Sequence, residues 1–123
     1  LPYCLQHKIG VVAYSPMQAG LLTGKFDFNK LAPDDWRRKN PYFQEPFLSK
    51  AIKFTDNVRP IADKYKKTIG QIAVAWVLQN PAITSAIVGA RTVEQVERNV
   101  GAAGFTLRDE DIQFIQNELQ TFA

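Results

Sequence analysis

The fold class follows from residues 10–16, which read GVVAYSP. The apolar run Val11–Tyr14 is too short for a helix and is bounded by a glycine and a Ser-Pro turn, so it predicts a strand buried on both faces. A second run of this kind, residues 83–88, ends at Gly89. Helical patterns occupy the chain between and after the two runs, and alternating strands and helices imply parallel pairing with crossover helices. The sequence therefore predicts an α/β protein.

A helix with an internal proline is predicted between the two strands. Apolar residues recur at helical spacing from Leu48 to Tyr65. Pro60 lies inside this pattern, and its ring clashes with the carbonyl of Asp56, so we expect the helix to kink or split there. Two strands are too few for a sheet that is covered on both faces. The chain therefore resembles part of a larger α/β fold.

Two capping-box patterns predict further helix starts. Thr68 is followed three residues later by Gln71, and Thr92 by Gln95. In this pattern the threonine hydroxyl accepts a hydrogen bond from the backbone N–H of the glutamine, and the glutamine side chain accepts one from the backbone N–H of the threonine. Valines at helical spacing follow the second pair, and they form one apolar helix face: Val93, Val96 and Val100.

Composition excludes several classes of protein. The chain has 123 residues, of which 46% are hydrophobic and 22% charged, as expected for one soluble globular domain. We expect no membrane association, because every long apolar run is interrupted by polar residues. The net charge of +3 is spread along the chain, which argues against a nucleic-acid partner. With only Cys4 and His7 the chain has no intrachain disulfide and no conventional zinc site, so a cytoplasmic location is expected.

The junction after the first strand has the residues of a phosphate site. Residues 14–25 read YSPMQAGLLTGK, in which small residues allow close backbone approach. Ser15 and Thr23 offer hydroxyl groups, and Lys25 adds a positive charge, which suits a phosphate. The alternative is a turn whose glycines serve only its backbone dihedral angles.

The junction after the second strand is similar. Residues 89–99 read GARTVEQVERN, so Arg91 precedes a helix N-terminus whose free N–H groups attract anions. Gln95 and Asn99 share a helix face and are amides that can read a base edge. Alternatively, Arg91 is a solvated surface charge and Gln95 only the partner in a capping box.

Together these stretches resemble the aldo-keto reductase family. The sequences IGVVAYSP (residues 9–16), GLLTGK (20–25), DWR (35–37) and IVGAR (87–91) occur in the family's order, and the resemblance runs to about residue 119. It is similar to the bacterial and plant branches and to the β subunits of voltage-gated potassium channels. The resemblance implies a (β/α)8 TIM barrel of which residues 1–123 form the C-terminal half, with strands 7 and 8 and their helices.

The resemblance also implies NADP(H) as the cofactor. The residues that would line its pyrophosphate and ribose are Ser15, Met17, Lys25 and Arg37. The residues that would hold its 2′-phosphate and adenine are Gly89, Arg91, Gln95 and Asn99. The long loop at residues 26–46 would close over the cofactor or substrate. Arg98 departs from the glutamate that is common at this position in the family, and its charge would also suit the 2′-phosphate.

The activity implied by the resemblance is reduction of aldehydes and ketones by hydride transfer. The family's catalytic Asp, Tyr, Lys and His would all lie upstream of this chain, so we expect no catalytic residue and no metal here, and no activity of the chain alone. The expected partners are a small carbonyl substrate and either the missing N-terminal half of the barrel or a second copy. The alternatives are a non-catalytic nucleotide-binding or barrel-completing module and a DNA-binding helical domain; the latter lacks a basic recognition helix.

Overall fold

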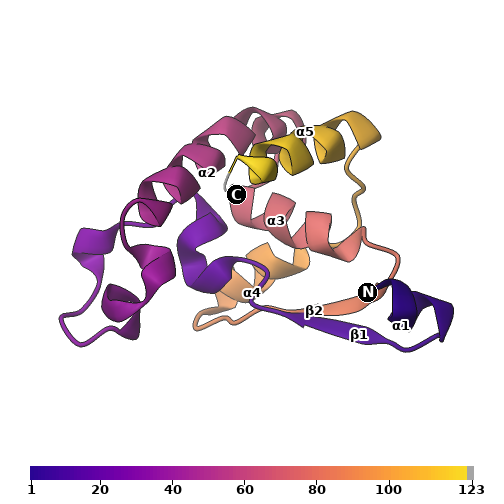
Figure 1. The fold of residues 1–123 in the computed structure, drawn as a ribbon, viewed down its shortest axis with the longest axis horizontal. Helices are drawn as coiled ribbons and strands as arrows, with labels where there is room; N and C mark the ends of the chain where they lie inside the picture. The colour runs from indigo at the N-terminus through magenta and orange to yellow at the C-terminus, as the bar shows by residue number, and fades with distance from the viewer. Residues whose placement is uncertain (122–123) are drawn as a thin grey trace.

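The two predicted strands pair with each other in parallel, as Figure 1 shows. The computed structural model of the protein describes residues 1–121. Strand β1 spans Val11–Tyr14 and strand β2 spans Ile83–Ile87, with Ala13 opposite Ala86. The predicted strand positions are confirmed, with β2 one residue shorter than expected. Residues 122–123, where the predicted C-terminal half ends, lie outside the described part of the chain.

Helices form most of the remaining structure. They are α1 (Pro2–Gln6), α2 (Phe47–Lys64), α3 (Ile69–Leu78), α4 (Val93–Val100) and α5 (Asp109–Gln120). Helix α3 lies against the sheet, and α2 and α5 pack together on the side of α3 away from the strands (Figure 1). Within residues 1–121, no helix is both long enough and apolar enough to cross a membrane.

The sheet is covered on one side only, so the prediction that both strands are buried on both faces is wrong. Val12 is 56% exposed, Tyr14 82% and Ile87 60%. Tyr14 and Ile87 lie opposite each other in the parallel register, and Val12 is two residues before Tyr14, so the three side chains share one face. Helix α3 packs on the sheet, and this face remains open to solvent in the described chain.

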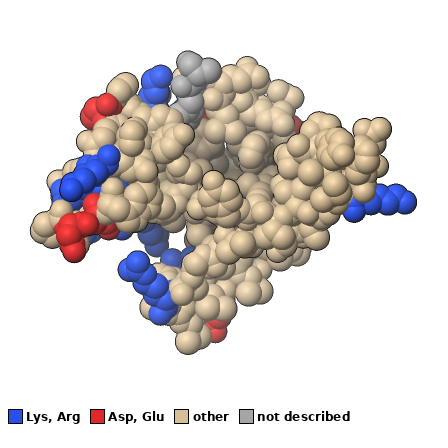
Figure 2. Space-filling view, turned by 60° about the horizontal axis from the view of Figure 1, so that its bottom comes forward, with Lys and Arg blue, Asp and Glu red and all other residues tan. Residues whose placement is uncertain are grey.

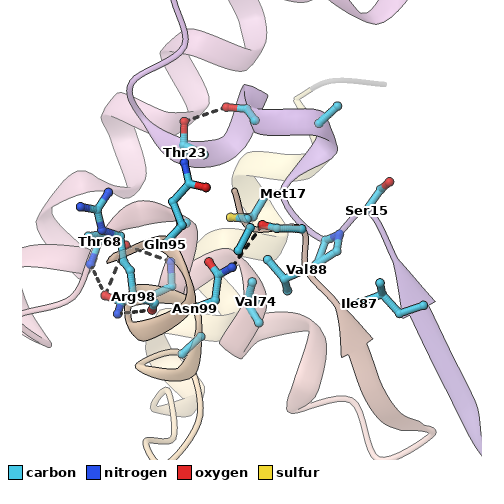
Figure 3. A pocket seen from close by; sticks show the side chains of 18 of the residues that line it. Ser15, Met17, Thr23, Thr68, Val74, Ile87, Val88, Gln95, Arg98 and Asn99 are labelled. Carbon is cyan, nitrogen blue, oxygen red and sulfur yellow. Dashed lines mark hydrogen bonds between the residues drawn. The ribbon is translucent and has the colours of Figure 1, made fainter. Parts of the chain in front are cut away.

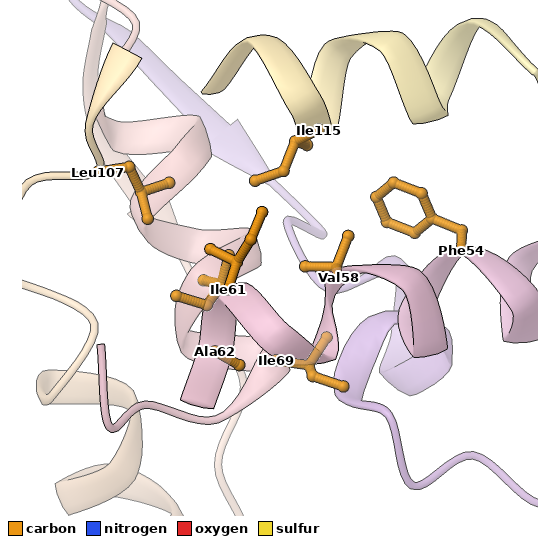
Figure 4. Close-up of a cluster of buried hydrophobic side chains, with 8 residues drawn as sticks. Phe54, Val58, Ile61, Ala62, Ile69, Leu107 and Ile115 are labelled. Carbon is orange, nitrogen blue, oxygen red and sulfur yellow. The ribbon is translucent and has the colours of Figure 1, made fainter. Parts of the chain in front are cut away.

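The main core lies between α2, α3 and α5 (Figure 4). Its buried side chains are Phe54, Val58, Ile61, Ala62, Ile69, Ile72, Leu107 and Ile115. Pro60 does not split α2, which runs unbroken through it. Both Pro60 and Asp56 are exposed, so the Asp56 carbonyl that loses its helical N–H donor can bond water instead.

The long loop is a chain of short 3₁₀ helices with its own apolar anchor. The side chains of Asp27, Asp35 and Asn40 each accept a hydrogen bond from the backbone N–H two residues later and so begin one short helix each. Phe43 is 1% exposed, and its ring makes a T-shaped contact with the Trp36 ring at 5.8 Å between centroids. Phe43 packs with Leu21, Leu48 and Ala51 and so anchors this loop to the β1 loop and to the start of α2.

Candidate functional site

One cavity of about 750 Å³ lies between the loops that follow the two strands. That volume is in the range of small-molecule and cofactor sites. All eight residues named from the sequence line it: Ser15, Met17, Lys25, Arg37, Gly89, Arg91, Gln95 and Asn99. Figure 3 shows Met17 from the β1 loop, Val74 from α3 and Asn99 from α4 around the same space. The fold thus brings together residues from distant parts of the sequence.

The loop after β1 holds several residues in an unfavourable backbone conformation. Ser15 has φ 53°, Gln18 φ 47° and Ala19 φ 50°, and Gly20 continues the run at φ 96°. Non-glycine residues rarely occupy this left-handed region, and each costs on the order of 1–3 kcal/mol when they do. Such strain is concentrated at functional sites. Here it curves the backbone around the cavity.

Glycines allow this loop to lie directly on α3. Gly24 has φ 70°, and a Cβ there would also collide with the side chain of Ile69. Gly70 is buried, and a Cβ there would come 3.0 Å from Sδ of Met17. The positive φ of Gly24 agrees with the interpretation of this junction as a glycine turn, while its position beside the cavity agrees with the binding interpretation.

Arg37 ties the long loop to the β1 loop. Its Nε and Nη2 donate to the two carboxylate oxygens of Asp35 at 2.9 and 2.6 Å, and its Nη1 donates to the carbonyl of Ala19 at 3.1 Å. The hydrogen bonds from Arg37 lower the pKa of Asp35 to about 2, and the carboxylate in turn raises the pKa of Arg37. The pair therefore stays charged at all physiological pH values.

The β2–α4 junction departs from the predicted capping box. The Thr92 hydroxyl accepts from the N–H of Gln95 at 3.2 Å, as expected. The Gln95 Oε1, however, accepts from the N–H of Arg91 at 2.6 Å, which is the nearer free donor on the incoming loop. Asn99 Nδ2 donates to the Gly89 carbonyl at 3.2 Å. Within residues 1–121, Nε2 of Gln95 and Oδ1 of Asn99 have no hydrogen-bond partner.

The cavity lining carries four cations and, among the described residues, no carboxylate. Arg37 is paired with Asp35, and Arg98 with Glu94 one helical turn earlier. Lys25 and Arg91 have no ion-pair partner in residues 1–121. Figure 2 shows basic side chains beside a hollow of this surface. A concave site with uncompensated positive charge attracts an anionic ligand.

Helix α3 contributes residues to the cavity that the sequence did not point to. Thr68, Gly70, Gln71 and Val74 all line it. The capping box of Thr68 and Gln71 is confirmed, but the pattern carries no information about a neighbouring site. His7 is not among the lining residues; its Nδ1 bonds the Tyr3 carbonyl at 2.9 Å. The described residues contain no group of three or more His, Cys, Asp or Glu side chains suited to a metal ion.

The sequence matches the Aldo/keto reductase family over residues 1–119. The chain belongs to this family. The chain of a solved glycerol dehydrogenase, AKR11B4 from Gluconobacter oxydans, is 36% identical, with a TM-score of 0.87, and the match covers 100% of this chain and 38% of that one. A thermostable aldo-keto reductase, Tm1743, is 21% identical with a TM-score of 0.62 over 95% of this chain and 32% of that one, which shows a shared fold. The predicted family and its barrel fold class are confirmed.

Curated aldo-keto reductases show the same relationship. The NADH-specific methylglyoxal reductase of Escherichia coli is 35% identical over 90% of this chain and 34% of its own length. The aldo-keto reductase yakc [NADP(+)] of Schizosaccharomyces pombe is 31% identical over 92% and 34%. A probable voltage-gated potassium channel subunit beta of Arabidopsis thaliana is 30% identical over 83% and 32%. The chain thus spans about a third of the length of these aldo-keto reductases and their relatives.

Proposed function

We propose that this chain is the NADP(H)-binding, C-terminal part of an oxidoreductase that reduces small aldehydes and ketones to alcohols. The observation that carries the proposal is the cavity itself, which is lined by all eight residues, from three separate segments, and has four cations in its lining. Family membership supplies the reaction class, and the cavity supplies the place for the cofactor.

The residues present fit a cofactor with two separate phosphate groups. Lys25 and Arg37 stand on the loop side of the cavity and suit the pyrophosphate. Arg91 and Arg98 stand on the α4 side and suit the 2′-phosphate. The unpaired amide atoms, Nε2 of Gln95 and Oδ1 of Asn99, suit hydrogen bonds to the adenine base. When bound, the nicotinamide ring supplies the hydride, and the residues of this chain bind and orient the other end of the molecule.

The assignment to NADP(H) rather than NAD(H) rests on the α4 side. Arg91 is a guanidinium with no carboxylate partner in the described chain, and a charge-assisted bond to a 2′-phosphate would compensate it. The relatives' own names include one NADH-specific and one NADP(+) enzyme. Cofactor choice is therefore the property to measure.

The catalytic residues are proposed to lie in the other half of the barrel. The open face of the sheet, with Val12, Tyr14 and Ile87, would then meet the side chains that fill a complete barrel. The same open face supports a second candidate, a non-catalytic module that completes a partner's barrel. We also propose a cytoplasmic location, because a chain with a single cysteine can form no intrachain disulfide.

Direct binding tests this proposal. The purified protein is titrated with NADPH and with NADH, and the change in nicotinamide fluorescence gives the two dissociation constants. We expect saturable binding with NADPH bound more tightly. Carbonyl reduction is then assayed with a panel of small aldehydes and ketones in the presence of the rest of the barrel, because the chain alone is expected to be inactive in both cases; turnover would identify the enzyme and its absence the non-catalytic module. Absence of binding to either dinucleotide would refute the cofactor assignment.

A further inference from the structure

Helix α4 is held in place by polar contacts rather than by packing. None of its residues is buried, and the valines of its apolar face, Val93, Val96 and Val100, are 76%, 51% and 67% exposed. Its residues nevertheless form one side of the cavity. The position of this side therefore depends on the few hydrogen bonds that reach α4 from the rest of the chain.

Gln71 of α3 makes one of these bonds. Its Oε1 accepts from the backbone N–H of Thr68 at 2.8 Å, which completes the capping box of α3. Its Nε2 donates to the carbonyl of Arg98 in α4 at 2.7 Å. One amide thus joins the start of α3 to the last turn of α4.

The carbonyl of Arg98 has no other donor among the described residues. At the end of α4 the N–H of Gly101 donates to the carbonyl of Glu97, and the N–H of Ala102 donates to the carbonyl of Asn99. Neither N–H therefore reaches the Arg98 carbonyl. Carbonyls in the last turn of a helix need a partner from outside the helix. Gln71 supplies that partner, and Lys67 does the same for the Gly101 carbonyl at 2.9 Å.

The first turn of α3 also contacts the opposite side of the cavity. Gly70 lies against Met17 of the β1 loop, so neighbouring residues of α3 touch both sides. Asn99 directly follows Arg98, and Gln95 lies one helical turn before Asn99, on the same helix face as Asn99. A shift of the Arg98 carbonyl therefore moves both amides that face the cavity.

We propose that Gln71 is a positioning residue for the α4 side of the site. By holding the Arg98 carbonyl, it fixes the distance between the amides of α4 and the β1 loop, and thereby sets the affinity for the adenosine 2′-phosphate end of the cofactor. The proposal rests on the proposed function, because it names what sets one part of that site.

The test compares the same substitution at two glutamines, Gln71 in the first turn of α3 and Gln79 directly after its last residue. Gln71→Met removes the amide without adding charge. Gln79→Met is the matched control, because the Gln79 amide also bonds to backbone but does not line the cavity. Its Nε2 donates to the Leu107 carbonyl at 3.0 Å, and its Oε1 accepts from the Leu107 N–H at 2.7 Å. The probes are adenosine 2′,5′-bisphosphate for the α4 side and inorganic pyrophosphate for the loop side, measured by calorimetry.

We expect Gln71→Met to weaken adenosine 2′,5′-bisphosphate about fivefold, the effect of one lost hydrogen bond, with pyrophosphate changed by less than about twofold. Gln79→Met should lower the melting temperature but leave both affinities unchanged. An equal loss for both probes, or the same loss in both variants, would show a purely structural role and overturn the proposal. If the unmodified protein binds neither probe, the proposed function itself fails, which is a separate result.

A second variant reaches the same contact from the other helix. Gly101 has φ −63°, so alanine fits its backbone, but a Cβ there would collide with Nε2 of Gln71. Gly101→Ala should therefore displace the amide while leaving Gln71 itself in place. We expect the same selective loss of adenosine 2′,5′-bisphosphate as in Gln71→Met. Unchanged affinity with a folded protein would contradict the proposal.

Discussion

One buried carboxylate, Asp111, adds polar contacts between α5 and the end of α2 to the apolar core that the helices share. It is 7% exposed and accepts from the Tyr65 hydroxyl at 2.6 Å and from Lys64 Nζ at 2.9 Å. Burial alone would raise the pKa of Asp111, but the hydrogen bonds from Tyr65 and Lys64 lower it overall, below its ordinary 3.8. Burial and the bond to Asp111 raise the pKa of Tyr65, so the phenol remains a donor.

Asp111→Asn keeps the shape of the side chain and removes its charge. Hydrogen bonds to a charged group contribute about 1.5–3 kcal/mol, and the neutral amide retains part of the bond to Tyr65, so we expect a loss of about 1.5–2 kcal/mol. For a chain of this size that corresponds to a fall in melting temperature of roughly 5–10 °C. Thermal unfolding followed by circular dichroism at pH 7 measures it.

Asp109→Asn is the control for this experiment. Asp109 lies in the same first turn of α5, is exposed, and has no ion-pair partner within residues 1–121. Both substitutions remove one charge from the helix N-terminus, so their difference isolates the buried contacts of Asp111.

The contribution of Asp111 to stability also depends on pH. Because the pKa of Asp111 is lower in the folded state than in the unfolded state, its contribution to stability is present above about pH 4 and is lost as the pH falls through the folded-state pKa. Equal melting temperatures for the two variants at pH 7 would refute the reasoning.

Three further predictions concern the site and the sheet. Arg91→Ala should weaken NADPH about 10–100-fold and hardly change NADH, by fluorescence titration, whereas Arg59→Ala on the far helix α2 should change neither; equal losses for both cofactors would contradict the role of Arg91. Gly24→Ala should lower the free energy of unfolding by about 1–3 kcal/mol in urea, because the position combines a positive φ with contact to α3, while Gly89→Ala, which has open space around it, should change it little; similar effects would refute the packing argument. Residues 1–123 alone should self-associate at micromolar concentration in light scattering and show no carbonyl reduction, and Tyr14→Lys on the open sheet face should reduce the association; a compact, active monomer would contradict both expectations.

Signals that act within one turn of the chain predicted local structure well. Thr68 and Gln71 form their capping box because both partners and both backbone groups lie within four residues. The apolar runs predicted the positions of the two strands for a similar reason, since a short apolar run that ends at a glycine or a Ser-Pro turn is a local pattern. The Thr92 box formed only in part because a competing donor, the Arg91 N–H, stands at the end of the adjoining loop.

Errors arose where the outcome depends on neighbours that the pattern does not contain. Apolar residues in a strand predict that both of its faces are covered, but they do not show whether a covering element is present. In the described chain, no element covers Val12 and Tyr14. Pro60 was expected to kink or split a helix, and the helix is not split, because the carbonyl of Asp56 that loses its donor lies on the solvent side. The two strand-to-helix junctions and the family resemblance together named the site residues, which do line one cavity. The bond between Gln71 and Arg98, in contrast, joins residues 27 positions apart and has no local signature.

The pairing of Arg37 with Asp35 and of Arg98 with Glu94 has a consequence for how binding responds to salt. Two of the four cations at the cavity already carry counterions that belong to the fold, so only Lys25 and Arg91 attract mobile anions from solution. Raising the ionic strength therefore screens two free charges rather than four, and the long-range capture of an anionic ligand should weaken accordingly. The guanidinium of Arg37 shapes the wall of the site at any ionic strength, because its carboxylate partner is held 2.6 Å away by the same turn of chain.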